Sequence, residues 1–260
     1  GSMNMVQTLD RDADPVIVTE HGSSYAVKTL ERDADPIIVT GAAMPYFIGA
    51  PLSQLFVFAY QGNQWRQIPW QFDEVKNGQF TALDNGTLDT ADELVFMGAD
   101  CGDEVASDIW INDADAQSHV RYEVKVIDPL NSAKLGWIYV FRSSTLVESN
   151  MEDYVNYDYA SSTFISPVYK LGFFPEYIGG NHLELNGSGI NVLECSKFRL
   201  SVLEQNAITE ESITLDEPQP KILDGRVRAI AGYQELGQGI LTIGYRSQFF
   251  DLITIDFSWS

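Results

Sequence analysis

Hydrophobic and polar residues occur in short runs along almost the whole chain, a pattern typical of β-strands. After residue 40 these runs are rich in β-branched and aromatic residues. They predict strands over residues 52–60, 65–70, 93–98, 119–127, 136–142, 163–171, 197–203, 226–233, 239–247 and 252–259.

Turn residues separate the runs, and no long stretch has the 3.6-residue period of a helix. Many strands without intervening helices predict an all-β fold with little helix, an antiparallel β-sandwich or the larger supersandwich. Residues 252–259 alternate cleanly almost to the last position, so we expect the sequence to end inside a domain or just after one.

A repeat lies near the N-terminus. Residues 8–19 read TLDRDADPVIVT and residues 29–40 read TLERDADPIIVT. Each copy predicts a polar turn, a proline and a short β-branched strand. One interpretation is that the spare copy pairs with a like chain by strand addition. The favoured interpretation is a duplicated leader of which one copy is docked.

The repeat sets the predicted domain organisation. Residues 1–3 are typical of those that an expression vector adds to a protein. Together with the first copy of the repeat they form the predicted N-terminal segment, residues 1–28. Residues 29–260 form one predicted β-sandwich domain.

Composition narrows the function classes. The chain is 45% hydrophobic, which excludes a disordered protein. Its formal charge of −21 disfavours a nucleic-acid partner. No apolar run is long enough to predict a membrane span. The acidic, lysine-poor composition favours an exported protein whose signal peptide is missing from this sequence.

The chain has two cysteines, Cys101 and Cys195, without the spacing of a zinc or C-x-x-C redox motif. They could close one long-range disulfide. The alternative is two buried free thiols.

Acidic residues concentrate in residues 73–115, which hold 12 of them against one lysine. Calcium in proteins takes about six to eight oxygen ligands, many from carboxylates. Val75 breaks the EF-hand spacing. The segment predicts a non-EF-hand calcium site with ligands from Asp73, Asp84, Asp89, Asp92 and Glu93. The alternative is a solvated acidic loop whose polar side chains cap turns.

Three motifs carry a family resemblance. Residues 67–74 read QIPWQFDE, residues 88–97 read LDTADELVFM, and residues 221–228 read KILDGRVR. They resemble large uncharacterised exported proteins of bacteria and archaea with the motifs piPxQxDE, LDxxDELVFM and DGpvR, although Arg226 stands where that family has proline. They are also similar to galactose-mutarotase-like supersandwich domains of polysaccharide lyases and glycosidases. The resemblance implies an exported β-sandwich with a carbohydrate link, and it transfers no catalytic residue.

Catalytic signatures are weak. No zinc-protease, α/β-hydrolase or nucleotide-loop motif occurs, so no organic cofactor is expected. A polysaccharide lyase needs a base beside a cation, for which the candidates are His182, Tyr154, Arg226 and Arg228. The negative charge would repel a polyanionic substrate, which disfavours a lyase. A glycoside hydrolase needs two carboxylates, and an acidic chain singles out no pair.

Aromatic residues are the better binding signal. Residues 153–159 read DYVNYDY, and sugar rings stack on such aromatic faces. Tyr154, Tyr157 and Tyr159 are therefore predicted to bind ligand. The sequence favours an exported binding or structural module that contacts carbohydrate or like chains. The alternative is the N-terminal part of a polysaccharide lyase or glycoside hydrolase.

Overall fold

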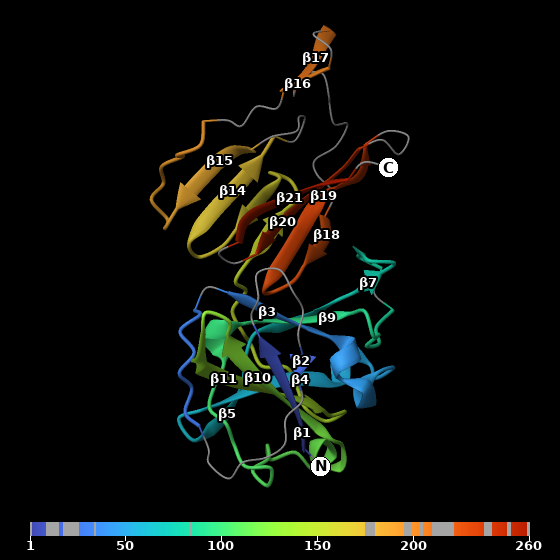
Figure 1. Ribbon diagram of the computed structural model, residues 1–260, viewed down its shortest axis with the longest axis vertical. Coiled ribbons are helices and arrows are strands. Elements are labelled where there is room, and N and C mark those ends of the chain that lie inside the picture. The colour runs from blue at the N-terminus through green and yellow to red at the C-terminus, as the bar shows by residue number, and fades with distance from the viewer. Residues whose placement is uncertain are drawn as a thin grey trace. The chain divides into compact units, whose positions relative to one another are not determined.

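The computed structural model describes residues 2–8, 16–17, 26–33, 35–83, 85–174, 180–194, 199–202, 205–209, 221–236, 241–248 and 251–258. Within them the chain is all-β, with mostly antiparallel strands and one short α-helix, which confirms the predicted fold class. The backbone divides into two compact units, Gly1–Glu152 and Asp153–Ser260 (Figure 1). Each unit has a hydrophobic core of its own, whereas the sequence pattern predicts one domain from residue 29 onward.

The first unit contains a six-stranded sheet in the order β2-β1-β10-β11-β4-β5 and a three-stranded sheet in the order β3-β9-β6. A small hairpin, β7 with β8, and the helix α1 complete it. The bounds are β1 Ser2–Thr8, β2 Val16–Ile17, β3 Pro36–Thr40, β4 Leu55–Gln61, β5 Gln64–Gln67, β6 Trp70–Asp73, β7 Val75–Lys76, β8 Gln79–Phe80, β9 Glu93–Met97, α1 Ala114–Ser118, β10 Arg121–Asp128 and β11 Asn131–Arg142.

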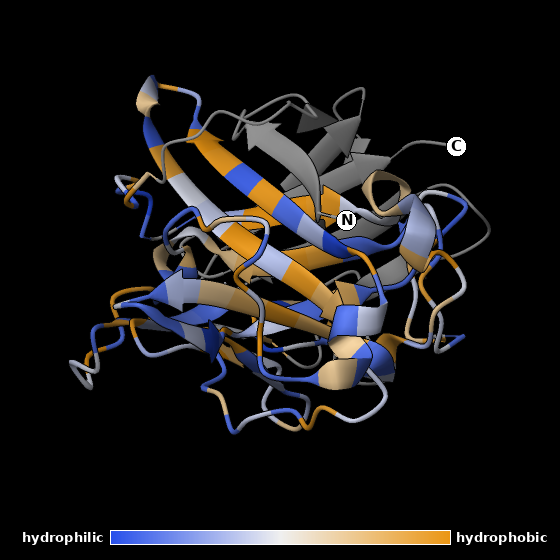
Figure 2. Cartoon of the chain, turned by 90° about the horizontal axis from the view of Figure 1, so that it is seen from below, coloured by the Kyte–Doolittle hydropathy of each residue, from blue (hydrophilic) through white to orange (hydrophobic). Residues whose placement is uncertain are grey.

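The two larger sheets of this unit pack face to face and share one core (Figure 1). Ile37 and Val39 of β3 have no exposed surface, and neither has any residue of β9 from Leu94 to Met97. In the six-stranded sheet, alternate residues of β10, namely Tyr122, Val124 and Val126, are buried in the same core. Hydrophobic and hydrophilic residues alternate along several strands (Figure 2), as a sheet with two different faces requires.

Most predicted strands are confirmed, and two of them prove to be composite. The predicted strand 65–70 is β5 and β6, which belong to different sheets. The break falls at Pro69, because proline cannot donate a hydrogen bond to a ladder. The predicted strand 163–171 is the hairpin of β13, Thr163–Ile165, and β14, Tyr169–Phe173.

The second unit contains two four-stranded sheets, β12-β13-β14-β15 and β18-β19-β20-β21, and the two-stranded sheet β16-β17. Its core joins Tyr157, Phe164 and Leu171 of the first sheet with Ala229 and Ala231 of the second. The remaining bounds are β12 Asn156–Asp158, β15 Gly180–Leu185, β16 Arg199–Val202, β17 Gln205–Thr209, β18 Lys221–Asp224, β19 Arg228–Leu236, β20 Leu241–Gln248 and β21 Asp251–Ser258.

Arg121, the first residue of β10, is fully buried on the sheet face opposite Tyr122. Its guanidinium carbon lies above three aromatic rings, at 5.1 Å from the centroid of Tyr139, 5.2 Å from that of Trp110 and 5.8 Å from that of Trp65. It also donates hydrogen bonds to the carbonyls of Ala106 and Ile109. Arg121 therefore holds the segment 106–110 against this face of the sheet.

Glu123 lies beside Arg121 and is 3% exposed, with one carboxylate oxygen 4.0 Å from the guanidinium. Burial raises the pKa of Glu123 to about 7, and the negative charge of Glu104 adds to this effect. The positive charges of Arg121 and Lys125 act in the opposite direction. The carboxyl group therefore changes its charge near neutral pH inside a packed core.

We predict that Glu123→Gln removes part of the pH dependence of stability. The native carboxyl binds its proton more tightly than the unfolded one, whose pKa is near 4.5, so Glu123 lowers stability as the pH rises from about 4.5 to 7. One pKa unit is worth about 1.4 kcal/mol. The free energy of unfolding of the variant, relative to that of the wild type, should therefore increase by a few kcal/mol when the pH is raised from 5 to 8. Urea unfolding at both values measures this, with the exposed Glu152→Gln as control. A variant that loses stability at pH 8 would show that the attraction to Arg121 outweighs burial.

Candidate functional site

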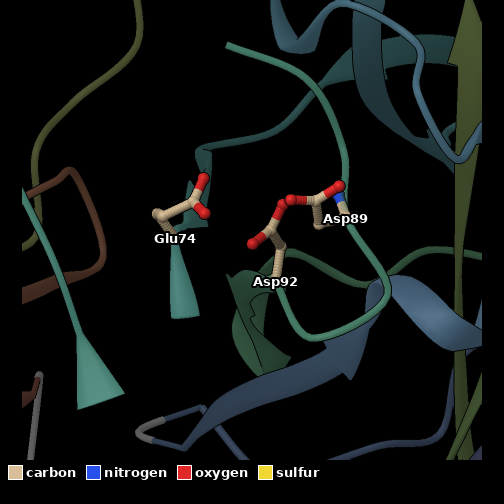
Figure 3. A group of neighbouring side chains, drawn as sticks. All are labelled: Glu74, Asp89 and Asp92. Atoms are coloured by element: carbon tan, nitrogen blue, oxygen red, sulfur yellow. The ribbon is translucent and has the colours of Figure 1, made fainter. Parts of the chain in front are cut away.

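Three carboxylates meet beside the three-stranded sheet. Glu74 follows β6, while Asp89 and Asp92 lie in the loop that leads into β9 (Figure 3). One carboxylate oxygen from each residue lies within 4.8 Å of the others. We call Glu74, Asp89 and Asp92 the carboxylate cluster.

Antiparallel pairing explains why residues so far apart in the sequence meet. β6 and β9 pair with Asp73 opposite Glu93, so β6 ends where β9 begins. The residue after the first strand, Glu74, and the residue before the second, Asp92, therefore lie at the same end of the sheet.

Backbone hydrogen bonds hold the loop that carries Asp89 and Asp92 in place. Leu88 is fully buried and anchors the middle of the loop. Five backbone hydrogen bonds of 2.7–2.9 Å join residues 86–92 to residues 41–52, namely Gly41 to Asp92, Ala42 to Thr90, Gly49 to Leu88, Leu88 to Ala50 and Leu52 to Gly86.

Gly41 is required at this contact. A Cβ atom at that position would lie 1.9 Å from the carbonyl oxygen of Asp89. Only glycine lets the two backbones approach so closely.

Asp92 is the most deeply buried residue of the cluster and is 1% exposed. One of its oxygens accepts a hydrogen bond from the Asp89 amide at 2.6 Å, and the other accepts one from the Val75 amide at 3.3 Å. Glu74 is also buried, whereas Asp89 is exposed. The cluster thus has two buried carboxylates and one that faces solvent.

This charge arrangement suits a cation. Like charges at such short range repel one another, and burial strengthens the repulsion. Hard divalent ions such as Ca²⁺ are bound by carboxylate oxygens.

The predicted metal ligands are only partly brought together. Asp89 and Asp92 join the cluster, whereas Asp73 and Glu93 face each other across the strand pair β6–β9 and are not part of it. Asp73 accepts a hydrogen bond from the Gln71 amide group at 2.6 Å. Asp84 lies outside the described residues. Glu74 was absent from the predicted ligand set, although its place directly after Asp73 at the end of a strand was a usable signal.

A second polar site lies in the second unit. A cavity of about 250 Å³ is lined by Asp153, Val155, Asn156, Asp224, Gly225 and Arg226. The guanidinium of Arg226 lies 3.4 Å from the carboxylate of Asp153. Asp224 accepts a hydrogen bond from the Tyr157 amide at 3.0 Å, which fixes one wall.

Of the four residues predicted for a lyase, only Arg226 lines this cavity. Arg228 is fully buried, so a dissolved substrate has no access to it. The Tyr154 amide donates to the Arg226 carbonyl at 2.6 Å. His182 lies on β15, where its imidazole is 3.8 Å from Glu184.

The three predicted binding tyrosines do not form one face. Tyr157 is 4% exposed, and its ring lies 4.7 Å from that of Phe164 in the core. Tyr159 is exposed and Tyr154 is half-buried. Tyr157 is the middle residue of β12 and is buried between the exposed Asn156 and Asp158, whereas Tyr154 and Tyr159 lie outside the strand.

Cys101 is a free thiol and fully buried. Burial raises the pKa of this thiol to about 12, so it is unreactive at neutral pH. Cys195, the other cysteine of the candidate disulfide, lies outside the described residues, so the pairing of the two cysteines stays a prediction.

Comparisons with protein-family models, curated proteins and solved structures find no match to this chain. Among the described residues, no helix has the length and apolar character needed to cross a membrane.

We predict that Gly41→Ala destabilises the loop of the carboxylate cluster. The new Cβ would meet the Asp89 carbonyl, and such overpacking costs about 1–3 kcal/mol or more. Chemical denaturation measures the loss. Ala42→Ser, an exposed change at the next residue, is the control. Equal stability of the two variants would mean that the loop shifts freely.

Proposed function

We propose that this chain is an exported binding module whose carboxylate cluster binds calcium. The proximity of Glu74, Asp89 and Asp92 carries the proposal. The ion would join the end of β6 to the loop before β9 and so stiffen the edge of the sandwich.

The type of ligand supports calcium over other metals. All three side chains offer hard oxygen atoms, which exclude metals that prefer thiolate or imidazole. Three carboxylates supply three to six oxygens, and water or backbone carbonyls can complete the six to eight that Ca²⁺ takes. Magnesium favours a small octahedral shell and keeps more of its water.

The type of site also supports a location of the protein outside the cytoplasm. Calcium sites of extracellular modules have dissociation constants of about 10⁻⁴–10⁻³ M. A site with one exposed ligand, such as Asp89, fits this weaker class. An exported module would meet enough calcium to fill it.

The first test is thermal unfolding in EGTA and then in calcium. A single site at about 100 times its Kd adds roughly 2.7 kcal/mol of stability, which raises Tm by several degrees. Asp92→Asn should abolish this calcium-dependent shift, although the variant also has a lower Tm in EGTA because Asp92 accepts two backbone hydrogen bonds.

Asp33→Asn is the matched control, because Asp33 is an exposed aspartate outside the cluster. Its calcium shift should equal that of the wild type. A wild type without a shift, or an Asp92→Asn variant with an unchanged one, would refute calcium binding at this site.

We also propose carbohydrate contact at the cavity of the second unit. Asp153, Asn156, Asp224 and Arg226 place carboxylate, amide and guanidinium groups around one small space. These are the groups that hydrogen-bond sugar hydroxyls. We propose binding in preference to turnover, because the lyase candidates other than Arg226 do not line the cavity.

Asn156→Ala should weaken binding of neutral hexose and uronate oligosaccharides by about threefold to tenfold, as expected for one lost hydrogen bond. Titration of each sugar, followed by NMR or calorimetry, measures this. The exposed Asn150→Ala should leave affinity unchanged. Equal affinities of both variants, or no binding by the wild type, would remove the cavity as the contact.

A further inference from the structure

The repeat near the N-terminus goes beyond the proposed functions. Of its twelve positions ten are identical, and the copies are offset by 21 residues. The second copy, residues 29–40, leads into and forms β3. In the first copy, the described strand β2 pairs only Val16 and Ile17 with β1.

The place of the second copy makes specific demands on its occupant. Ile37 and Val39 have no exposed surface and pack in the core. β3 pairs with β9 at all five of its positions. We call the place of β3 along β9, together with the contacts of residues 29–35, the β3 slot.

Polar residues that precede β3 also bind the second copy to the rest of the unit. Arg32 forms ion pairs with Asp35 and with Asp128. The carbonyl of Asp35 accepts a hydrogen bond from the Gly98 amide at 2.9 Å. The Thr29 hydroxyl donates to the Ala133 carbonyl at 3.0 Å.

The first copy carries the same side chains for each of these contacts. Arg11, Asp14 and Thr8 correspond to Arg32, Asp35 and Thr29. At the two fully buried positions the first copy has Val16 for Ile37 and Val18 for Val39. The only loss in the core is one methylene group.

The residue after the strand distinguishes the copies. Gly41 follows the second copy, and its close approach to Asp89 excludes any side chain. Glu20 stands at the equivalent place after the first copy. The second copy is therefore the better occupant, because only it continues into the glycine that the loop of the carboxylate cluster requires.

We propose that the first copy is a replacement strand, which occupies the β3 slot of its own chain when the second copy is displaced. The sandwich can then form with either copy in the β3 slot. When the first copy occupies the slot, residues 20–40 form a loop outside the sheet. The occupant comes from the same chain because only residues 20–40 connect the first copy to Gly41, and a short flexible tether gives a local concentration of the order of millimolar.

Single and double substitutions on the full chain test this. Val39→Asp puts a charge into the core at the second copy, yet it should keep a cooperative unfolding transition with Tm lowered by several degrees, because the first copy takes over. Val18→Asp should leave Tm unchanged. The double variant Val18→Asp/Val39→Asp should lose the cooperative transition.

Hydrogen exchange locates the strand. In Val39→Asp, amide protection should move from residues 36–40 to residues 15–19, and light scattering should give the mass of a monomer. If Val39→Asp is as unstable as the double variant, no replacement takes place and the proposal fails. A stable Val39→Asp variant that exists only as a dimer would also overturn it, since the strand would then come from a neighbouring chain.

Discussion

Backbone pairing on both edges of β9 is the constraint on which the first unit depends. β9 pairs with β3 along one edge and with β6 along the other, and its four residues from Leu94 to Met97 are completely buried. The pairing with β6 brings Glu74 to Asp92 and so creates the carboxylate cluster. The pairing with β3 creates the slot that the repeat can fill. The metal proposal and the replacement strand thus depend on the same strand.

Gly41 couples these two features. It directly follows β3 in the chain, and it contacts the loop that carries Asp89 and Asp92. Whichever copy fills the β3 slot therefore affects how firmly the cluster is held. A cation bound at the cluster would favour the copy that continues into Gly41, because any ligand stabilises the state that binds it.

Several ionisable side chains are buried in this unit, and their surroundings differ. Arg121 lies over aromatic rings and donates hydrogen bonds to two backbone carbonyls of the segment that covers it. Glu123 is penalised by burial, which raises its pKa towards neutrality. Asp92 has two backbone amides as donors. Partner geometry decides the outcome in each case, since a buried charge is costly unless it is paired or hydrogen-bonded.

The sequence by itself determined the all-β class, the approximate positions of most strands and the acidic character of the loop before β9. These properties depend on local composition and on a period of two residues, which are visible along the chain. Tertiary structure alone decided that Glu74 joins Asp89 and Asp92, that Tyr157 faces the core, and that residues 65–70 divide between two sheets. Each of these depends on which strands pair and which face is covered. Pairing joins residues that are distant in sequence, so no local pattern contains it.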